Sequence, residues 1–298
     1  MPARPPARPP ARRPDGRAAA IPRSWLFVPG DSPRKMRRAA ASGADALILD
    51  LEDSVAPEAR PAARAAVAAF LSEGAPRGPA VWVRVNALDT GITAQDVAAL
   101  AGRDVAGFVL PKCAGPDHVE ALARMIPPGA GILAIATETV RALRRLMRED
   151  WSHPRLTALT WGGEDLAADL GATANRGDGG RYLGPFLLAR DVTLLAAAEA
   201  GVAAIDAVHP DFRDLAGLAA ETREAASLGF AGKMAIHPAQ IPVIHDALRP
   251  DAAEIAWAER VIAALEAAGG GVAQLDGHML DRPHLRKARR ILDRAGRG

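Results

Sequence analysis

The chain has 298 residues, which is long enough for one barrel-sized domain or for two smaller domains. Its single cysteine, Cys113, excludes an intrachain disulfide framework and favours a reducing, cytoplasmic compartment. The net charge is +2, but residues 1–20 contribute +4 through five arginines and one aspartate, so the remaining −2 gives no argument for nucleic-acid binding.

The N-terminal residues are a low-complexity mixture of Pro, Arg and Ala. They contain no aromatic or β-branched residue before Ile21, so they have nothing to bury. We predict a disordered tail over residues 1–21. No later apolar stretch is long enough to cross a membrane, so we expect no membrane partner.

Apolar runs of strand length then recur along the chain. Each is followed by a polar turn and by a helical pattern of Ala, Leu and Arg. They are SWLFVPG (24–30), ADALILDLED (44–53), AVWVRVN (80–86), VAGFVLPK (105–112), GILAIATET (131–139), LTALTWGGED (156–165), AAIDAVHPD (203–211) and GKMAIHP (232–238). Runs that are apolar throughout indicate parallel strands covered on both faces.

This repeat predicts an α/β fold, a (β/α)8 TIM barrel over residues 22–268, because eight βα units in this length match that architecture. A doubly wound sheet is the main alternative, but the phosphate-binding glycine fingerprint is missing after the first run. Residues 269–298 form a predicted C-terminal helical extension.

Charged residues gather where these runs end, and barrel enzymes place their chemistry at the C-terminal ends of their strands. The residues that we assign to this rim are Asp31, Asp50, Glu52, Asp53, Arg84, Asn86, Lys112, Glu138, Glu164, Asp165, Asp206, His209, Lys233 and His237. Carboxylates without a Cys/His cluster favour Mg²⁺ over zinc.

Each rim residue also has a structural explanation. Glu138 and Asp165 could be acids in the first turn of a helix. Arg84 needs an anionic partner, which could be a neighbouring acid or a substrate carboxylate. For His237, a packing role is favoured over catalysis.

Seven sequence strings together resemble the citrate lyase β subunit and malyl-CoA lyase group of the HpcH/HpaI aldolase superfamily. They occur in order from Arg23 to about Leu292. The strings are RSWLFVPGDSPRKMRRAAASGADALILDLEDSV, VRVN, VLPK, ET at Glu138, GGEDLAADLG, GKMAIHPAQI and DGHMLDRPHLRKAR.

The resemblance implies a Mg²⁺-dependent lyase that makes or breaks a carbon–carbon bond between an acyl-CoA and a 2-oxo acid. It implies that Glu138 and Asp165 are metal ligands and that Arg84 binds the oxo-acid carboxylate. It also implies that Asp281 completes a neighbouring subunit's site as acid or base, which requires a homotrimer or hexamer. From its position alone, Asp281 would be the N-cap of the helix that follows it, and the resemblance favours the catalytic role instead.

Three functions remain in view. The first is an acyl-CoA lyase acting on malyl-, citramalyl- or citryl-CoA, with acetyl- or propionyl-CoA as the other partner. The second is a 3-hydroxyacyl-CoA thioesterase on the same fold, and the third is a non-catalytic subunit that binds CoA esters. The phosphates of CoA would meet Arg34, Lys35 or Arg38, unless these residues form an ordinary solvated helix face.

Overall fold

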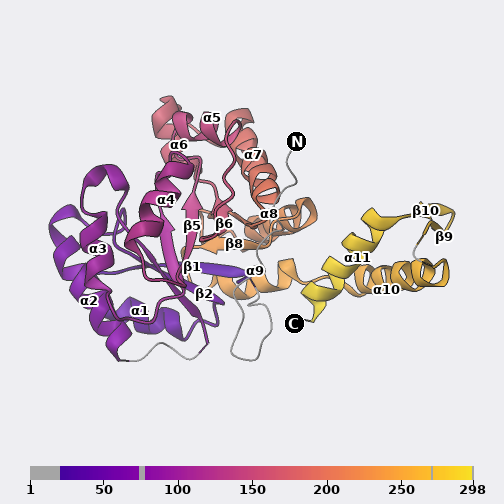
Figure 1. Ribbon diagram of the computed structural model, residues 1–298, viewed down its shortest axis with the longest axis horizontal. Coiled ribbons are helices and arrows are strands. Elements are labelled where there is room, and N and C mark those ends of the chain that lie inside the picture. Colours follow the sequence, from indigo (N-terminus) through magenta and orange to yellow (C-terminus); the bar gives the residue numbers. More distant parts are fainter. Residues whose placement is uncertain (1–20, 74–77, 270, 297–298) are drawn as a thin grey trace. The chain divides into compact units, whose positions relative to one another are not determined.

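The computed structural model describes residues 21–73, 78–269 and 271–296. Within these residues, eight parallel strands pair in chain order and close into a barrel through the pairing of β8 with β1 (Figure 1). The strands are β1 (Ser24–Pro29), β2 (Ala46–Asp50), β3 (Ala80–Arg84), β4 (Gly107–Leu110), β5 (Gly131–Ile135), β6 (Leu156–Thr160), β7 (Ala203–Asp206) and β8 (Gly232–Ala235). The predicted TIM barrel is confirmed, and each predicted apolar run contains one strand.

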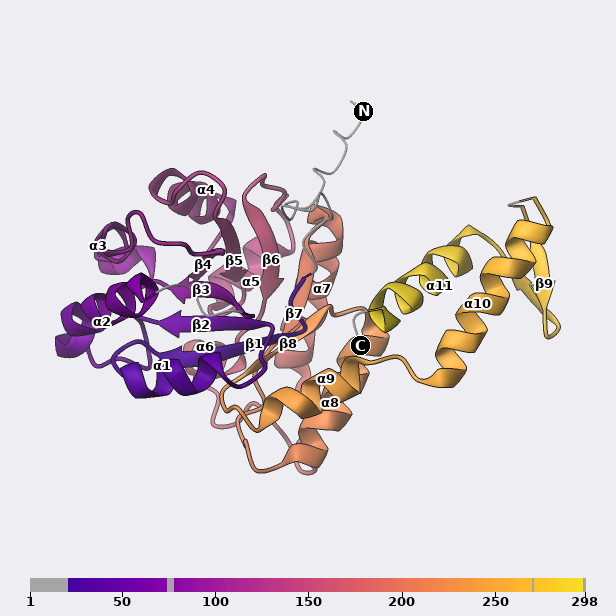
Figure 2. The ribbon, with the colours of Figure 1, turned by 90° about the horizontal axis from the view of Figure 1, so that it is seen from below.

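Helices connect successive strands and lie around the outside of the barrel (Figures 1 and 2). They are α1 (Pro33–Ala40), α2 (Arg60–Ser72), α3 (Thr93–Ala99), α4 (Pro116–Met125), α5 (Val140–Leu146), α6 (Gly163–Leu170), α7 (Gly184–Ala200) and α8 (Leu215–Leu228), with α9 (Gln240–Leu248) following β8. All five residues of β2 are buried, as expected for a strand covered on both faces.

Large side chains fill the interior of the barrel and require small neighbours. Trp25 and Trp82 pack edge to face with ring centroids 5.1 Å apart. A Cβ atom on Gly107 would lie 2.3 Å from Cζ3 of Trp82, and one on Gly131 would lie 2.9 Å from its Cη2. Glycine at the start of β4 and β5 therefore makes room for the indole of β3.

The chain forms two compact units, the first ending at Ile244 and the second beginning at His245. In the second unit, α10 (Ala252–Ala267) packs against α11 (Arg282–Ala295) around Val261, Leu265 and Ala288. The hairpin of β9 (Ala273–Leu275) and β10 (His278–Leu280) connects these helices (Figure 2). Its two-residue turn is Asp276–Gly277, and both residues have positive φ, as a type I′ turn requires.

This division differs from the boundary at residue 269 that the sequence analysis expected. Because α10 buries its apolar face against α11, it belongs with the C-terminal unit rather than with the barrel. Residues 1–20 of the expected tail lie outside the described residues. No helix in the described ranges has both the length and the apolar character needed to cross a membrane.

Candidate active site

Asp50, the last residue of β2, organises the loop that follows it. Its Oδ1 accepts the N–H of Glu52 at 3.0 Å, and its Oδ2 accepts the N–H of Ser54 at 3.1 Å. The side chain is buried, and burial alone would raise the pKa of Asp50. Hydrogen bonds and the charge of Arg84 outweigh burial and hold this pKa below its ordinary value, so the carboxylate is ionised.

Arg84, at the end of the neighbouring strand β3, is the partner of Asp50. Its Nε and Nη2 each donate to Asp50 at 2.7 Å, and its Nη1 lies 3.1 Å from Oε2 of Glu52. The guanidinium also lies over the ring of Phe27 at 4.9 Å. Of the two partners that the sequence left open for Arg84, the structure supplies the neighbouring acid.

Lys112 follows β4 and contacts acids from two other strand ends. Its Nζ lies 2.6 Å from Glu52 and 3.3 Å from Asp53, which follow β2, and 3.5 Å from Asp165, which lies in α6. Its backbone N–H donates to Oε2 of Glu138. Burial lowers the pKa of Lys112, but these carboxylates outweigh burial and raise the pKa above its ordinary value, so the ammonium stays charged.

Glu138 follows β5 and is 3% exposed. Burial, together with the charge of Asp165, raises the pKa of Glu138 to about 8. Gly162 lies against it, and a Cβ atom on Gly162 would approach Cγ of Glu138 to 2.8 Å. Glycine at position 162 therefore lets the loop after β6 pass close to the Glu138 side chain.

Glu138 and Asp165 have the donor chemistry that a hard divalent cation takes. Both supply carboxylate oxygens, and the charge of Asp165 disfavours ionisation of Glu138, an effect that a bound cation would offset. Among the described residues no group of three or more His, Cys, Asp and Glu side chains is arranged to hold a metal ion. The remaining ligands of a Mg²⁺ ion would therefore be water and substrate oxygens, as is usual for this ion.

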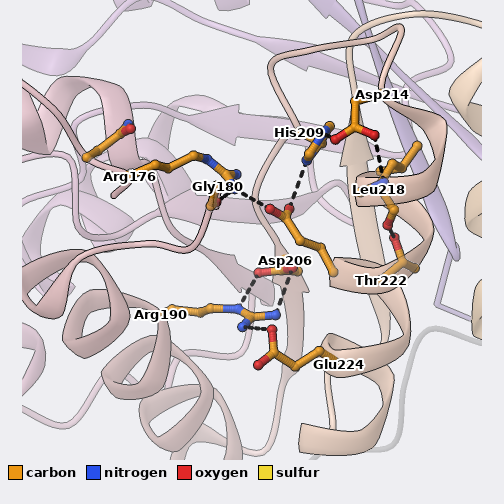
Figure 3. Close-up of polar contacts among 12 residues, drawn as sticks. Arg176, Gly180, Arg190, Asp206, His209, Asp214, Leu218, Thr222 and Glu224 are labelled. Atoms are coloured by element: carbon orange, nitrogen blue, oxygen red, sulfur yellow. Dashed lines mark hydrogen bonds and ion pairs between the residues drawn. The ribbon is translucent and has the colours of Figure 1, made fainter. Parts of the chain in front are cut away.

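A second polar cluster lies between the barrel and helices α7 and α8 (Figure 3). Asp206 of β7 accepts hydrogen bonds from Arg190 of α7 at 3.0 and 3.2 Å, from Lys233 of β8 at 2.8 Å and from Trp161 at 2.8 Å. Burial would raise the pKa of Asp206, but Lys233 and Arg190 lower it. The assignment of Asp206 and Lys233 to the rim is wrong, because their side chains point away from the barrel interior and pair with Arg190 of α7 and Glu221 of α8.

Glu221 of α8 extends this cluster to two loops. It pairs with Arg176, lies 3.3 Å from Lys233, and approaches Nδ1 of His209 at 3.2 Å. Arg176 and His209 are labelled in Figure 3. The guanidinium of Arg176 lies over the ring of Tyr182 at 3.7 Å. The cluster thus joins the loop after α6 and the loop after β7 to the body of the barrel.

Three further residues from the sequence analysis, Asp281, His237 and Cys113, have structural surroundings of their own. Asp281 belongs to the C-terminal unit, where it is the N-cap of α11 and its Oδ1 lies 2.6 Å from Nδ1 of His284. His237 stacks on Phe212 and accepts the N–H of Ala239, which agrees with a packing role. Cys113 is fully buried, and burial raises its pKa to about 12, so its thiol is not a nucleophile.

The sequence brought Arg84, Glu138 and Asp165 forward, and the structure gathers them at one end of the barrel, linked through Glu52 and Lys112. The sequence analysis did not identify Asp50 as the residue that holds Arg84. The signal was available, because Asp50 and Arg84 end adjacent strands and occupy paired positions in the sheet.

Comparison with known proteins gives one consistent result. The HpcH/HpaI aldolase/citrate lyase family matches residues 23–238. A citrate lyase subunit beta-like protein of Mycobacterium tuberculosis is 40% identical over 91% of this chain and 95% of its own length. A (3S)-malyl-CoA thioesterase of Cereibacter sphaeroides is 37% identical over 92% of this chain and 94% of its own.

The solved structures include a protein similar along nearly the whole chain. It is CitE from Mycobacterium tuberculosis in complex with magnesium, acetoacetate and coenzyme A. The TM-score is 0.82 at 40% identity, with 93% of this chain and 99% of the other covered.

Proposed function

The chain belongs to the HpcH/HpaI aldolase/citrate lyase family, and from this premise we propose that it is a Mg²⁺-dependent carbon–carbon lyase. It makes or breaks the bond between acetyl- or propionyl-CoA and a 2-oxo acid, with malyl-, citramalyl- or citryl-CoA as the substrate type. One observation carries this proposal. A buried arginine, Arg84, is fixed by Asp50 in the same cluster as the carboxylates Glu138 and Asp165.

Glu138 and Asp165 are the proposed ligands of the cation. The similar CitE protein crystallised with magnesium supports this assignment, as does the donor chemistry of the two carboxylates. When bound, Mg²⁺ supplies stabilisation of the negative charge on the oxygen that becomes the keto oxygen of the product.

Arg84 is the proposed partner of the oxo-acid carboxylate. A guanidinium presents two forks of paired N–H groups, and Asp50 occupies the fork formed by Nε and Nη2. The fork formed by Nη1 and Nη2 matches a substrate carboxylate in a bidentate arrangement, in which the substrate takes the place of Glu52 at Nη1. Because Asp50 fixes the plane of the guanidinium, this second fork has a defined direction.

In the cleavage direction, the 3-hydroxyl group of the substrate gives its proton to a base and the bond between C2 and C3 breaks. The electron pair of that bond forms the enolate of the CoA thioester, which takes up a proton at C2 to give acetyl- or propionyl-CoA. We assign this proton transfer to Asp281 from a neighbouring copy of the chain, which requires a homotrimer or hexamer. The phosphates of CoA are assigned to Arg34, Lys35 and Arg38, which are exposed on α1.

A 3-hydroxyacyl-CoA thioesterase is the second candidate. The specific observation in its favour is the (3S)-malyl-CoA thioesterase that is similar over nearly the whole chain. In that reaction, water attacks the thioester carbonyl and the thiol of CoA leaves, so the carbon chain stays intact. The third candidate, a non-catalytic CoA-ester-binding subunit, does not use Asp281 as an acid or base.

The deciding experiment incubates the purified protein with malyl-, citramalyl- and citryl-CoA, in Mg²⁺ and in EDTA, and follows 2-oxo acid and free thiol separately. We expect Mg²⁺-dependent formation of the 2-oxo acid without an equal release of thiol. Release of thiol without formation of a 2-oxo acid would show that the protein is a thioesterase and not a lyase. If neither product forms and Mg²⁺ does not change the melting temperature, the non-catalytic CoA-ester-binding subunit becomes the favoured function.

A further inference from the structure

Lys112 has an unusual position in the acidic cluster because its two polar groups hold the two proposed metal ligands. The backbone N–H donates to Glu138, and the side-chain ammonium lies 3.5 Å from Asp165. The ammonium also contacts Glu52 at 2.6 Å and Asp53 at 3.3 Å. One residue therefore contacts the carboxylates that follow β2, β5 and β6.

The backbone of Lys112 is held in a conformation that disfavours a side chain. Its φ is +48°, and Asp276 in the β9–β10 turn is the other non-glycine residue in the described ranges with positive φ. Glycine would adopt this conformation without strain, so a lysine here indicates that the side chain contributes something that glycine cannot. In Lys112 that contribution is the ammonium group.

Acidic side chains outnumber basic ones around Lys112. The described part of the cluster contains the carboxylates of Asp50, Glu52, Asp53, Glu138 and Asp165 against the cations Arg84 and Lys112. Asp50 takes one fork of Arg84, and its remaining nitrogen faces Glu52. Of these two cations, Lys112 is the one that lies within 4 Å of Asp165 in the described structure.

A divalent cation on Glu138 and Asp165 and an ammonium at Asp165 would lie within a few ångströms of each other. Two positive charges at such a distance repel strongly in a partly desolvated site. Lysine suits a group that must move, because its charge is a compact ammonium on a flexible four-carbon stem. Glu52 and Asp53 already contact the ammonium and can hold it when it leaves Asp165.

We propose that Lys112 is a tethered counter-ion of this site, which competes with the divalent cation for Asp165 and withdraws to Glu52 and Asp53 when the cation binds. This inference rests on the proposed metal site at Glu138 and Asp165. It makes Lys112 a positioning residue that sets the affinity of the site for Mg²⁺. In the absence of Mg²⁺, the ammonium of Lys112 holds the acids in place. The same ammonium lowers the affinity of the site for Mg²⁺.

The test compares Lys112→Met with the wild-type protein by isothermal titration with MgCl₂ and by thermal unfolding in EDTA and in saturating Mg²⁺. Methionine keeps the unbranched stem and the backbone N–H but removes the charged end of the side chain. We expect Lys112→Met to bind Mg²⁺ about tenfold more tightly, because the competing cation is gone. We also expect a lower melting temperature in EDTA and a larger rise on adding Mg²⁺ than in the wild type.

Two further variants control for charge. Lys112→Arg keeps a cation in the cluster and should bind Mg²⁺ no more tightly than the wild type. Arg103→Met removes an exposed positive charge from the loop after α3 and should leave Mg²⁺ affinity unchanged.

Each outcome decides the inference. Equal or weaker Mg²⁺ binding by Lys112→Met, with normal binding by the wild type, overturns the counter-ion role and leaves the proposed function standing. A wild-type protein that binds no Mg²⁺ overturns both the metal site and the counter-ion role. If Lys112→Met is too unstable to purify, Lys112→Gln removes the same charge and the same comparison applies.

Discussion

Asp50 holds the guanidinium of Arg84 through two hydrogen bonds of 2.7 Å, and the same carboxylate accepts the backbone N–H groups of Glu52 and Ser54. A buried acid at the end of one strand thus fixes both the arginine of the next strand and the loop that carries Glu52. The orientation of the proposed oxo-acid site therefore depends on a residue that need not contact the substrate.

Replacing Asp50 with Asn should damage stability and oxo-acid binding together. Asn cannot accept both N–H groups of Arg84, so the arginine loses its ionised partner in a buried place. We expect a loss of about 3 to 5 kcal/mol in the free energy of unfolding, measured by urea denaturation. In the condensation direction, KM for the 2-oxo acid should rise more than KM for the acyl-CoA.

A matched control for this prediction is the exposed pair of Arg37 and Glu73. Glu73→Gln breaks an ion pair of similar length at the surface, where such pairs contribute about 0 to 1 kcal/mol. A similar small loss for Asp50→Asn, with unchanged kinetics, would show that Asp50 does not hold Arg84 in solution.

Gly162→Ala tests the position of Glu138. The added Cβ would lie 2.8 Å from Cγ of Glu138, so the carboxylate must move. We expect the rise in melting temperature caused by Mg²⁺ to shrink, with a loss of only a few degrees in EDTA. Gly184→Ala is the control, because nothing lies within 4 Å of its added Cβ, and it should keep the full response to Mg²⁺.

Glu221→Gln should change the pH dependence of stability. Burial would raise the pKa of Glu221, but hydrogen bonds from His209 and Arg176 and the charge of Lys233 lower it far below its ordinary value of 4.5. A carboxyl group whose pKa is lower in the folded than in the unfolded protein stabilises the folded state at pH values above its unfolded-state pKa. This stabilisation is lost progressively as the pH falls from the unfolded-state pKa through the folded-state pKa. At neutral pH, the free energy of unfolding of the wild type should exceed that of Glu221→Gln by about 2 to 4 kcal/mol.

This difference should narrow in urea unfolding experiments as the pH falls below about 4.5, since protonation of Glu221 removes the wild type's advantage. Both proteins keep Asp206 together with Lys233 and Arg190, the cations that lower its pKa. A difference that stays constant with pH would contradict the ionised, paired state of Glu221.

Asp281→Asn separates catalysis from helix capping. We expect turnover to be lost while the melting temperature stays within a few degrees, because a side-chain amide is also a good N-cap. Activity that survives together with a large loss of stability would return Asp281 to a capping role.

Mixed oligomers test whether Asp281 acts in a neighbouring copy. Neither Asp281→Asn nor Glu138→Gln alone should turn over substrate. In an equal, randomly assorted mixture, about a quarter of the sites would combine an intact Glu138 from one copy with an intact Asp281 from the next. Activity should therefore reappear on mixing and reassembly, and a mixture that stays inactive would contradict a site shared between copies.

The sequence predicted the barrel and most of the acidic cluster because both follow from one regularity. Eight apolar runs gave the strands, and the charged residues after β2 to β6 gave the cluster. The same rule failed for Asp206 and Lys233. Ile205 and Met234, their chain neighbours, face the barrel interior, so alternation along a strand turns Asp206 and Lys233 outward to meet α7 and α8.

Other features depend on contacts between distant segments and were not predictable from pattern. The boundary of the C-terminal unit follows from the packing of α10 on α11. The left-handed backbone of Lys112 occurs together with its hydrogen bond to Glu138, 26 residues away in the chain. Neither a local propensity nor a motif specifies these contacts.

The central claim is that Glu138 and Asp165 hold the divalent cation that supports catalysis. The most direct measurement is anomalous diffraction from crystals soaked with Mn²⁺ in place of Mg²⁺ together with a 2-oxo acid. We predict one strong peak within ligand distance of both carboxylates, with the carboxylate of the acid on Nη1 and Nη2 of Arg84 in place of Glu52. A peak elsewhere, or no peak at these two residues when the oxo acid is bound, would contradict it.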